Sequence, residues 1–228
     1  MNYADLELAI HGTAAESIVH RECREVLLDV VEGRLPLTAV CHPLGFFCLP
    51  IYRDGELGVC IHVWTSDLPH ARSTTSNVHC HSWDLTSFVL YGRVSHTLFQ
   101  VQDDIRGPDR VFEIHSVGDD DEITPTARYV RCARSAEQVT APQASYRLAS
   151  GQFHTSIVDR STETATVVLG RSRGATDLTI GARNTPGHRV RRRRCSAAET
   201  AEIALIAIAG LATASSSDDD ESTRQEPP

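Results

Sequence analysis

Residues 77 to 96 read NVHCHSWDLTSFVLYGRVSH, and the fold prediction starts from this stretch. His79 and His81 are separated by one residue, and Gly92 follows thirteen positions after His79. Side chains alternate between faces along a strand, so the two histidines point to one side, roughly 7 Å apart, and Cys80 points to the other. Two imidazoles placed in this way can bind one metal ion, but a firm site needs a third ligand from another strand.

The surrounding sequence predicts many short strands. From residue 46 to about residue 172, apolar stretches alternate with turn residues, as in FFCLPIY and LGVCIHVW on either side of a turn at Asp54–Gly55. Further strand candidates include SFVLYG, HTLFQVQ, RVFEIHSV and TATVVLG. Many short strands separated by Gly, Pro, Asp and Asn are typical of a sandwich or barrel.

Helical patterns flank this β region. Apolar residues recur every three or four positions in AAESIVHRECREVLLDVVEG, which predicts a helix ending near Gly33, and a shorter helix precedes it at 4–10. SAAETAEIALIAIAGL predicts a C-terminal helix that Ser196 and Glu199 cap. We therefore expect an N-terminal helical extension over 1–43, a barrel over 44–185, a basic segment with the C-terminal helix over 186–212, and a disordered acidic tail over 213–228.

Composition narrows the classes of function. The chain has 228 residues, 41% of them hydrophobic and 23% charged, which suits one folded domain. Its net charge of −8 gives no electrostatic reason to bind nucleic acid. The chain has no run of eighteen apolar residues and no signal-like N-terminus, so we expect no membrane partner.

The cysteines indicate the compartment. Seven are scattered along the chain with no CxxC pair, and the odd count fits reduced thiols in a cytoplasm better than a disulfide framework. Neither Cys60 nor Cys80 has a fixed base in view, so both are expected to be small core residues rather than nucleophiles. The sequence therefore predicts a cytoplasmic protein.

A second histidine motif completes the pattern. In ASGQFHTS, His154 follows Gly151 by three residues at the start of another apolar strand. HxH, a turn glycine and a distant GxxH together resemble the cupin superfamily over roughly residues 44 to 172. The resemblance implies a mainly β fold, an antiparallel jelly-roll barrel, with a metal held inside by His79, His81 and His154.

The match to the cupin motifs has gaps. The family's glutamate ligand falls at Leu85, and its second-motif proline and asparagine fall at Ala149 and Val158. Asp84 is the candidate replacement for the glutamate, as a fourth ligand or as a hydrogen-bond partner of a ligand. An odd number of positions separates Asp84 from His81, so a β-bulge would be needed to turn it inward.

A cupin with three histidine ligands resembles the thiol dioxygenases related to cysteine dioxygenase. The order of Trp64, a polar loop, HxH, a glycine turn and SHTLF is also similar to that family. The resemblance implies Fe(II), which binds a thiol- or amino-acid-like substrate and O2 at its open positions; zinc, nickel or manganese would accept the same ligands. Because cupins are often dimers, a homodimer is also left open.

Strand alternation from His81 adds two candidates for the substrate site. Tyr91 would share the histidine face and donate a hydrogen bond to a substrate, and Arg93 would hold a carboxylate, against the alternative of a solvated residue just beyond a turn. His62, His96 and His115 are expected to be ordinary barrel-wall residues. Two other functions use the same fold: a redox-neutral isomerase, decarboxylase or lyase, and a non-catalytic ligand-binding cupin.

Overall fold

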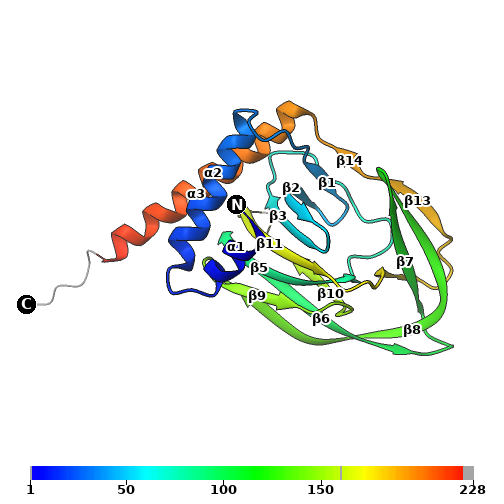
Figure 1. Cartoon of the computed structure of the whole chain (residues 1–228). Coiled ribbons are helices and arrows are strands. Elements are labelled where there is room, and N and C mark those ends of the chain that lie inside the picture. The colour runs from blue at the N-terminus through cyan, green and yellow to red at the C-terminus, as the bar shows by residue number, and fades with distance from the viewer. Residues whose placement is uncertain (1, 160, 223–228) are drawn as a thin grey trace, which may run out of the picture.

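In the described part of the chain, fourteen strands form two antiparallel sheets that curve around a common interior (Figure 1). The structure is a computed structural model, and it describes residues 2–159 and 161–222. The first sheet has the order β14 (Arg193–Arg194), β1 (Val40–His42), β2 (Phe46–Asp54), β3 (Leu57–Trp64), β11 (Thr164–Ser172), β5 (Trp83–Tyr91) and β9 (Ser145–Leu148).

The second sheet lies opposite the first. Its order is β13 (His188–Arg191), β8 (Asp120–Thr140), β6 (Val94–Asp103), β10 (His154–Ile157), β4 (His79–Cys80), β12 (Asp177–Ala182) and β7 (Asp109–Val117). β7, at the end of this order, also pairs with β8, so the strands from β8 to β7 form a closed ring. Val168 of the first sheet and Val94 of the second belong to one buried cluster, which places both inside the barrel.

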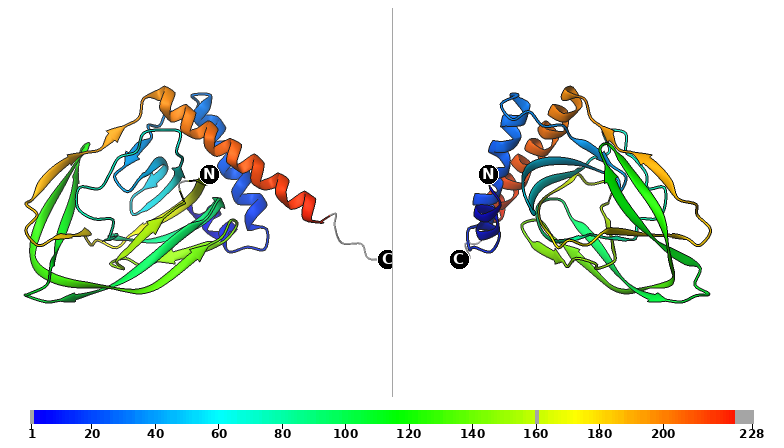
Figure 2. Two further views of the ribbon diagram at one scale, coloured as in Figure 1. Left: turned by 180° about the vertical axis from the view of Figure 1, so that it is seen from behind. Right: turned by 45° about the vertical axis from the view of Figure 1, so that its right-hand side comes forward.

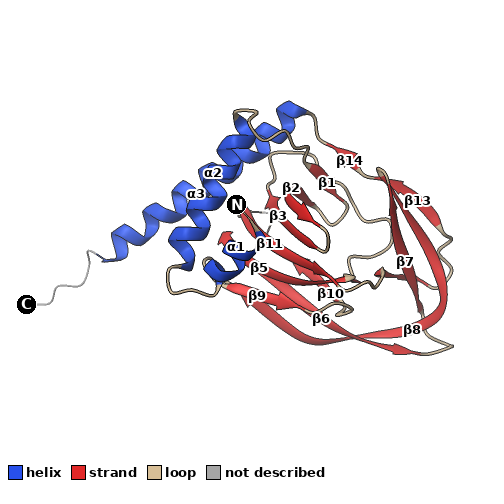
Figure 3. Ribbon diagram, viewed as in Figure 1, coloured by secondary structure: helices blue, strands red, loops and turns tan. Residues whose placement is uncertain are grey.

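Three helices cover the outer face of the first sheet (Figures 2 and 3). They are α1 (Tyr3–Ile10), α2 (Ala15–Val31) and α3 (Ala197–Ser222). Along β3 the side chains of Val59, Ile61 and Val63 are fully buried in the core shared with these helices, while the residues between them face the other way. Each such aliphatic side chain contributes about 1.5–3 kcal/mol by leaving water.

The predicted fold class is confirmed: the protein is mainly β, an antiparallel barrel with N-terminal helices and a C-terminal helix. The sheets extend past the predicted barrel limits, because β1 begins at Val40 and β13 and β14 lie beyond residue 185. α3 continues to Ser222, past the predicted helix end at residue 212. The last part of the predicted disordered tail, 223–228, lies outside the described residues.

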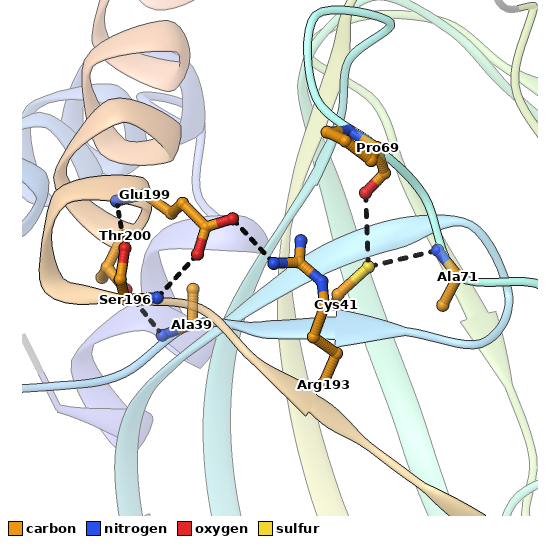
Figure 4. Close-up of polar contacts among 8 residues, drawn as sticks. All are labelled: Ala39, Cys41, Pro69, Ala71, Arg193, Ser196, Glu199 and Thr200. Carbon is orange, nitrogen blue, oxygen red and sulfur yellow. Dashed lines mark hydrogen bonds and ion pairs between the residues drawn. The ribbon is translucent and has the colours of Figure 1, made fainter.

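The start of α3 carries the predicted cap (Figure 4). The Ser196 hydroxyl accepts a hydrogen bond from the Glu199 N–H at 3.1 Å, and the Glu199 carboxylate accepts from the Ser196 N–H at 2.8 Å. The same carboxylate pairs with Arg193 at 2.7 Å, and Thr200 accepts the Ala39 N–H at 3.1 Å. The cap therefore joins the helix to the edge of the first sheet.

The arginine run finds acidic partners within the fold. β13 pairs with the acidic start of β8, and Arg189 forms an ion pair with Glu122. Arg194 forms an ion pair with Asp119 at 2.6 Å, and Arg192 lies 3.4 Å from Asp121. The two more exposed pairs, at Arg189 and Arg194, contribute little stability each, but the alternation of charge suits one register of the two strands.

One helical stretch has the length and composition of a membrane span. Among the described residues, Ala197–Ala214 alone passes this test, with a mean hydropathy of 1.5, and 28% of it is buried in the structure. Ile203, Ala204 and Ala207 of this stretch lie in the core between α3 and the first sheet.

Gly92 should be the least replaceable turn residue of the barrel. It has φ +75°, and an added Cβ would lie 2.2 Å from Thr164 Oγ1 and 2.5 Å from the Glu163 carbonyl oxygen. We predict that Gly92→Ala lowers the free energy of unfolding by about 3 kcal/mol or more, from backbone strain plus a clash. Gly118→Ala is the matched control, because φ is +63° there but the space is open, and it should cost about 1–2 kcal/mol. Equal losses in urea unfolding would contradict the steric argument.

Candidate metal centre

Three histidines from the second sheet converge inside the barrel. His154 on β10 pairs directly with His79 on β4, and His81 follows one residue beyond the end of β4. One ligand atom from each of the three lies within 4.8 Å of the others. The ring centroids are 4.3 Å apart for His79 and His154, 4.8 Å for His79 and His81, and 5.2 Å for His81 and His154.

Backbone carbonyls orient two of these rings. His79 Nδ1 lies 2.9 Å from the Asn77 carbonyl oxygen, and His154 Nδ1 lies 3.0 Å from the Gln152 carbonyl oxygen. A carbonyl only accepts, so each Nδ1 carries the hydrogen and each Nε2 keeps its lone pair. This is the tautomer that leaves Nε2 free to bind a metal ion.

The loop before β10 is tied to the HxH strand. The His81 carbonyl accepts hydrogen bonds from the Gly151 N–H at 2.9 Å and from the Ser150 hydroxyl at 3.3 Å. Gly151 has φ +78°, a conformation that glycine adopts without strain. The glycine of the second motif therefore holds the chain where His154 can reach the other two histidines.

Burial keeps the three imidazoles neutral. Desolvation lowers the pKa of His79, and it lowers the pKa of His81 well below the usual value, with His79 and His154 adding repulsion. The pKa of His154 falls to about 3, first through desolvation and then through His79. Neutral imidazole is the form that binds a metal, so no proton needs to be removed near pH 7.

A cavity of about 180 Å³ opens beside these rings. His79 and His81 form part of its wall, together with His42, Arg192 and Asp121. The rest of the wall is largely Ser, Thr and aliphatic residues. Trp83 packs on His81 with ring centroids 4.4 Å apart, which restricts the rotation of that imidazole.

Asp84 lies outside the three-histidine group. Its carboxylate accepts the Ser150 N–H at 2.9 Å and the Arg173 guanidinium at 2.6 Å, and its side chain is 40% exposed. The Ser150 N–H, then Arg173, hold the pKa of this carboxyl below its usual value. Between His81 and Asp84 the chain leaves β4 and enters β5 of the other sheet, where Asp84 pairs with Arg171 without a register shift. The Asp84 carboxylate supports the loop before His154.

Tyr91 and Arg93 also lie away from the histidines. The register between β5 and β11 shifts after Val89, so Leu90 is an extra residue and Tyr91 pairs with Ala165 on the helix-covered face. A Cβ at Gly210 of α3 would lie 2.3 Å from the Tyr91 ring, which shows how closely that ring packs on the helix. Arg93 is exposed just beyond the turn, the alternative that the sequence left open.

Sequence reasoning missed two residues of the cavity, His42 and Arg192. His42 stacks on Phe46 with centroids 4.3 Å apart, and desolvation lowers its pKa to about 3. Arg192 follows the last residue of β13, inside an arginine run that gave no sign of which member turns inward. Only the break between β13 and β14 distinguishes it from its neighbours.

The other histidines expected in the barrel wall have different environments. His96 on β6 is 1% exposed, and its Nδ1 lies 3.0 Å from Ser156 Oγ on the neighbouring β10. Desolvation lowers its pKa to about 4. His115 on β7 is exposed and lies 3.2 Å from Glu113. His62 belongs to a separate group of side chains described below.

No protein-family model and no curated protein matches this chain. Solved structures similar to it include hydroxypropylphosphonic acid epoxidase from S. wedmorenis, with 13% identity over 56% of this chain and a TM-score of 0.31. The match spans half (50%) of the epoxidase's own length.

Two further solved structures are also similar to this chain. A cupin superfamily protein from Desulfitobacterium hafniense DCB-2 has 6% identity over 56% of this chain and 77% of its own, with a TM-score of 0.32. Hydroquinone 1,2-dioxygenase from Sphingomonas sp. TTNP3, with 4-hydroxybenzoate bound, has 14% identity over 55% of this chain and 65% of its own, with a TM-score of 0.34. A protein of the cupin superfamily is thus among the solved structures similar to this chain.

Acid should destabilise the metal-free protein below about pH 6.5. Unfolded histidines titrate near 6.5, whereas folded His154 and His42 titrate near 3 and His96 near 4. As the pH falls between these values the unfolded chain binds more protons, so stability is full above about pH 6.5 and is lost towards pH 4.

Each such histidine contributes a slope of about 1.4 kcal/mol per pH unit, which urea unfolding in the presence of a chelator measures. His154→Gln should reduce the slope by about one histidine's share. An unaltered slope in His154→Gln would contradict the burial argument.

Proposed function

We propose that this protein is a metal-dependent enzyme of the cupin type that acts on a small molecule, with His79, His81 and His154 as the metal ligands. The observation that supports this most directly is the convergence of three neutral imidazoles, two with Nδ1 already bound to backbone, within 4.8 Å beside a cavity.

The donor set fits a mononuclear ion. Around an ion with metal–nitrogen distances of about 2.0–2.1 Å, tetrahedral ligand nitrogens lie about 3.4 Å apart, so the rings need to close by little more than 1 Å. Three imidazoles from one chain leave coordination positions free on the cavity side. When bound, Fe(II) would supply open positions and electron transfer towards O2, and this oxygenation is the chemistry that we favour.

The chain's own residues suit a small substrate with an anionic group. A volume of about 180 Å³ lies below the roughly 300–1,000 Å³ typical of drug-sized ligands, and suits a thiol or amino acid. Arg192 lines the cavity, where its guanidinium would orient a carboxylate. Its contacts with Asp121 and the Gly118 carbonyl, 2.7 Å away, hold the side chain in place. The Trp83 ring packs on the His81 ring and restricts its rotation.

One observation favours a redox-neutral reaction as the second candidate. Asp121 lines the same cavity, and its side chain is only 14% exposed. A carboxylate there would act as a general base for an isomerase, decarboxylase or lyase in which the metal is a Lewis acid. A titratable group beside the proposed metal also makes a purely ligand-binding cupin the weakest of the three readings.

Metal content tests the ligand assignment. Protein purified without added metal or nickel affinity resin should carry about one iron per chain at this site. His154→Ala should lose that iron, and Asp84→Asn, the matched control, should keep it, because the Asp84 carboxylate is bound by Ser150 and Arg173. Elemental analysis of the three proteins gives the answer, and equal iron in wild type and His154→Ala would overturn the assignment.

Measurement of oxygen uptake then distinguishes oxygenation from a redox-neutral reaction. With a panel of thiols and amino acids, the iron-loaded protein should consume O2 with at least one of them, and His154→Ala should not. Arg192→Ala should raise KM for an anionic substrate by about tenfold or more, since one charge-assisted contact is lost. Turnover of a panel member without O2 consumption would move the assignment to the redox-neutral candidate.

A further inference from the structure

A second group of metal-binding side chains lies on the opposite sheet. Cys48 on β2 and Cys60 and His62 on β3 each offer one ligand atom within 4.8 Å of the other two. All three side chains are half-buried. They project from the face of the first sheet opposite Val59, Ile61 and Val63, and therefore face into the barrel rather than towards the helices.

A β-bulge produces this arrangement. Near the Asp54–Gly55 turn, Tyr52 pairs with Val59, and beyond Pro50 the register shifts by one so that Cys48 pairs directly with His62. Without the shift Cys48 would lie opposite Val63 and share its helix-covered face. Pro50 has no N–H to donate, which suits the irregular point of the ladder.

Neighbouring groups hold the donors in position. The His62 ring stacks on Phe46 with centroids 4.3 Å apart and meets Trp64 edge-on at 6.0 Å. Phe46 is itself stacked on His42, so it lies between His62 and the cavity of the three-histidine site.

Two sulfurs and one imidazole nitrogen suit a thiophilic ion. In a tetrahedral zinc site with Zn–S near 2.3 Å and Zn–N near 2.0–2.1 Å, ligand atoms lie about 3.5–3.8 Å apart, so the group needs to contract by about 1 Å. Half-buried side chains leave an entry path for the ion and room for a water as fourth ligand.

We propose that Cys48, Cys60 and His62 form a second metal site of this protein, which binds a thiophilic ion such as Zn²⁺ and is distinct from the three-histidine centre. Its soft donors discriminate between ions in the opposite sense from the imidazole set: thiolates select zinc-class ions, while three imidazoles accept iron. Each thiol that is still protonated releases its proton to solvent when the ion binds.

Cobalt substitution tests the proposal, since Co²⁺ replaces Zn²⁺ at thiolate sites and gives a sulfur-to-cobalt charge-transfer band in the near ultraviolet. Reduced, metal-free full-length protein is titrated with Co²⁺ under argon. The band should saturate at about one equivalent per chain and should disappear when Zn²⁺ is added. It should persist in His154→Ala, so the result is independent of the three-histidine site.

Variants identify the ligands. Cys48→Ser and Cys60→Ser should each weaken the band and lower the affinity for Zn²⁺ by about tenfold or more, and His62→Gln should lower the affinity while the band remains. Cys132→Ser, a half-buried free thiol on β8, is the matched control and should match wild type in both readouts. Thermal unfolding of all four variants checks that they fold.

Thiol reactivity gives a second readout. Zn²⁺ should protect two cysteines of wild type from a thiol reagent, and one fewer in either serine variant. The proposal is overturned if reduced wild type gives no charge-transfer band with excess Co²⁺, if the band survives unchanged in Cys48→Ser and Cys60→Ser, or if Zn²⁺ protects no thiol. Failure here would leave the iron content and its loss in His154→Ala unaffected.

Discussion

The pairing of His154 with His79 is the contact on which the interior of this barrel depends. β4 is only two residues long, and it lies between β10 and β12. Its Cys80 is buried in a cluster with Val111, Val130 and Ile180, while the neighbouring His79 meets His81 and His154. A slip of one residue would exchange these two side chains, moving an imidazole into an apolar cluster and a thiol into the three-histidine group.

Burial in the barrel makes it costly to protonate the histidines of its interior. The pKa values of His42, His79, His81, His96 and His154 are all lowered, and burial is the leading cause each time. The barrel therefore holds several desolvated, neutral imidazoles that acid can charge, and a metal ion would bind the lone pairs of His79, His81 and His154. A cation bound by these nitrogens would stabilise the folded chain, because the unfolded chain does not bring them together.

Bulges decide which polar side chains reach the interior. The extra residue at Leu90 moves Tyr91 out to the helices, and the shift beyond Pro50 brings Cys48 in to meet His62. Both changes occur in strands whose other residues alternate regularly. One irregular residue per strand is thus enough to remove a phenol from the interior of the barrel and to build a group of sulfur and nitrogen donors on the opposite wall.

The sequence alone predicted the periodic features, because local spacing determines them. The helix ending near Gly33, the cap at Ser196 and Glu199, and the strands around Asp54–Gly55 follow from patterns a few residues long. The motif spacings also pointed to the three histidines that the structure brings together. Strand alternation predicted that Asp84 points away from them, but its position is set by the change of sheet between β4 and β5.

Tertiary structure decided what depends on register between distant strands. The bulges at Leu90 and beyond Pro50 reflect the fit of whole strands against their neighbours. Pro50 suits an irregular point of the ladder, but it does not by itself fix where the register shifts. Arg192 is one of six consecutive arginine or valine positions, 189–194, that look alike in the sequence, and only the break between β13 and β14 distinguishes it from its neighbours. The sequence gives the chemistry of each side chain. The face of the sheet on which that side chain lies depends on the register of pairing with neighbouring strands, which are distant in the sequence.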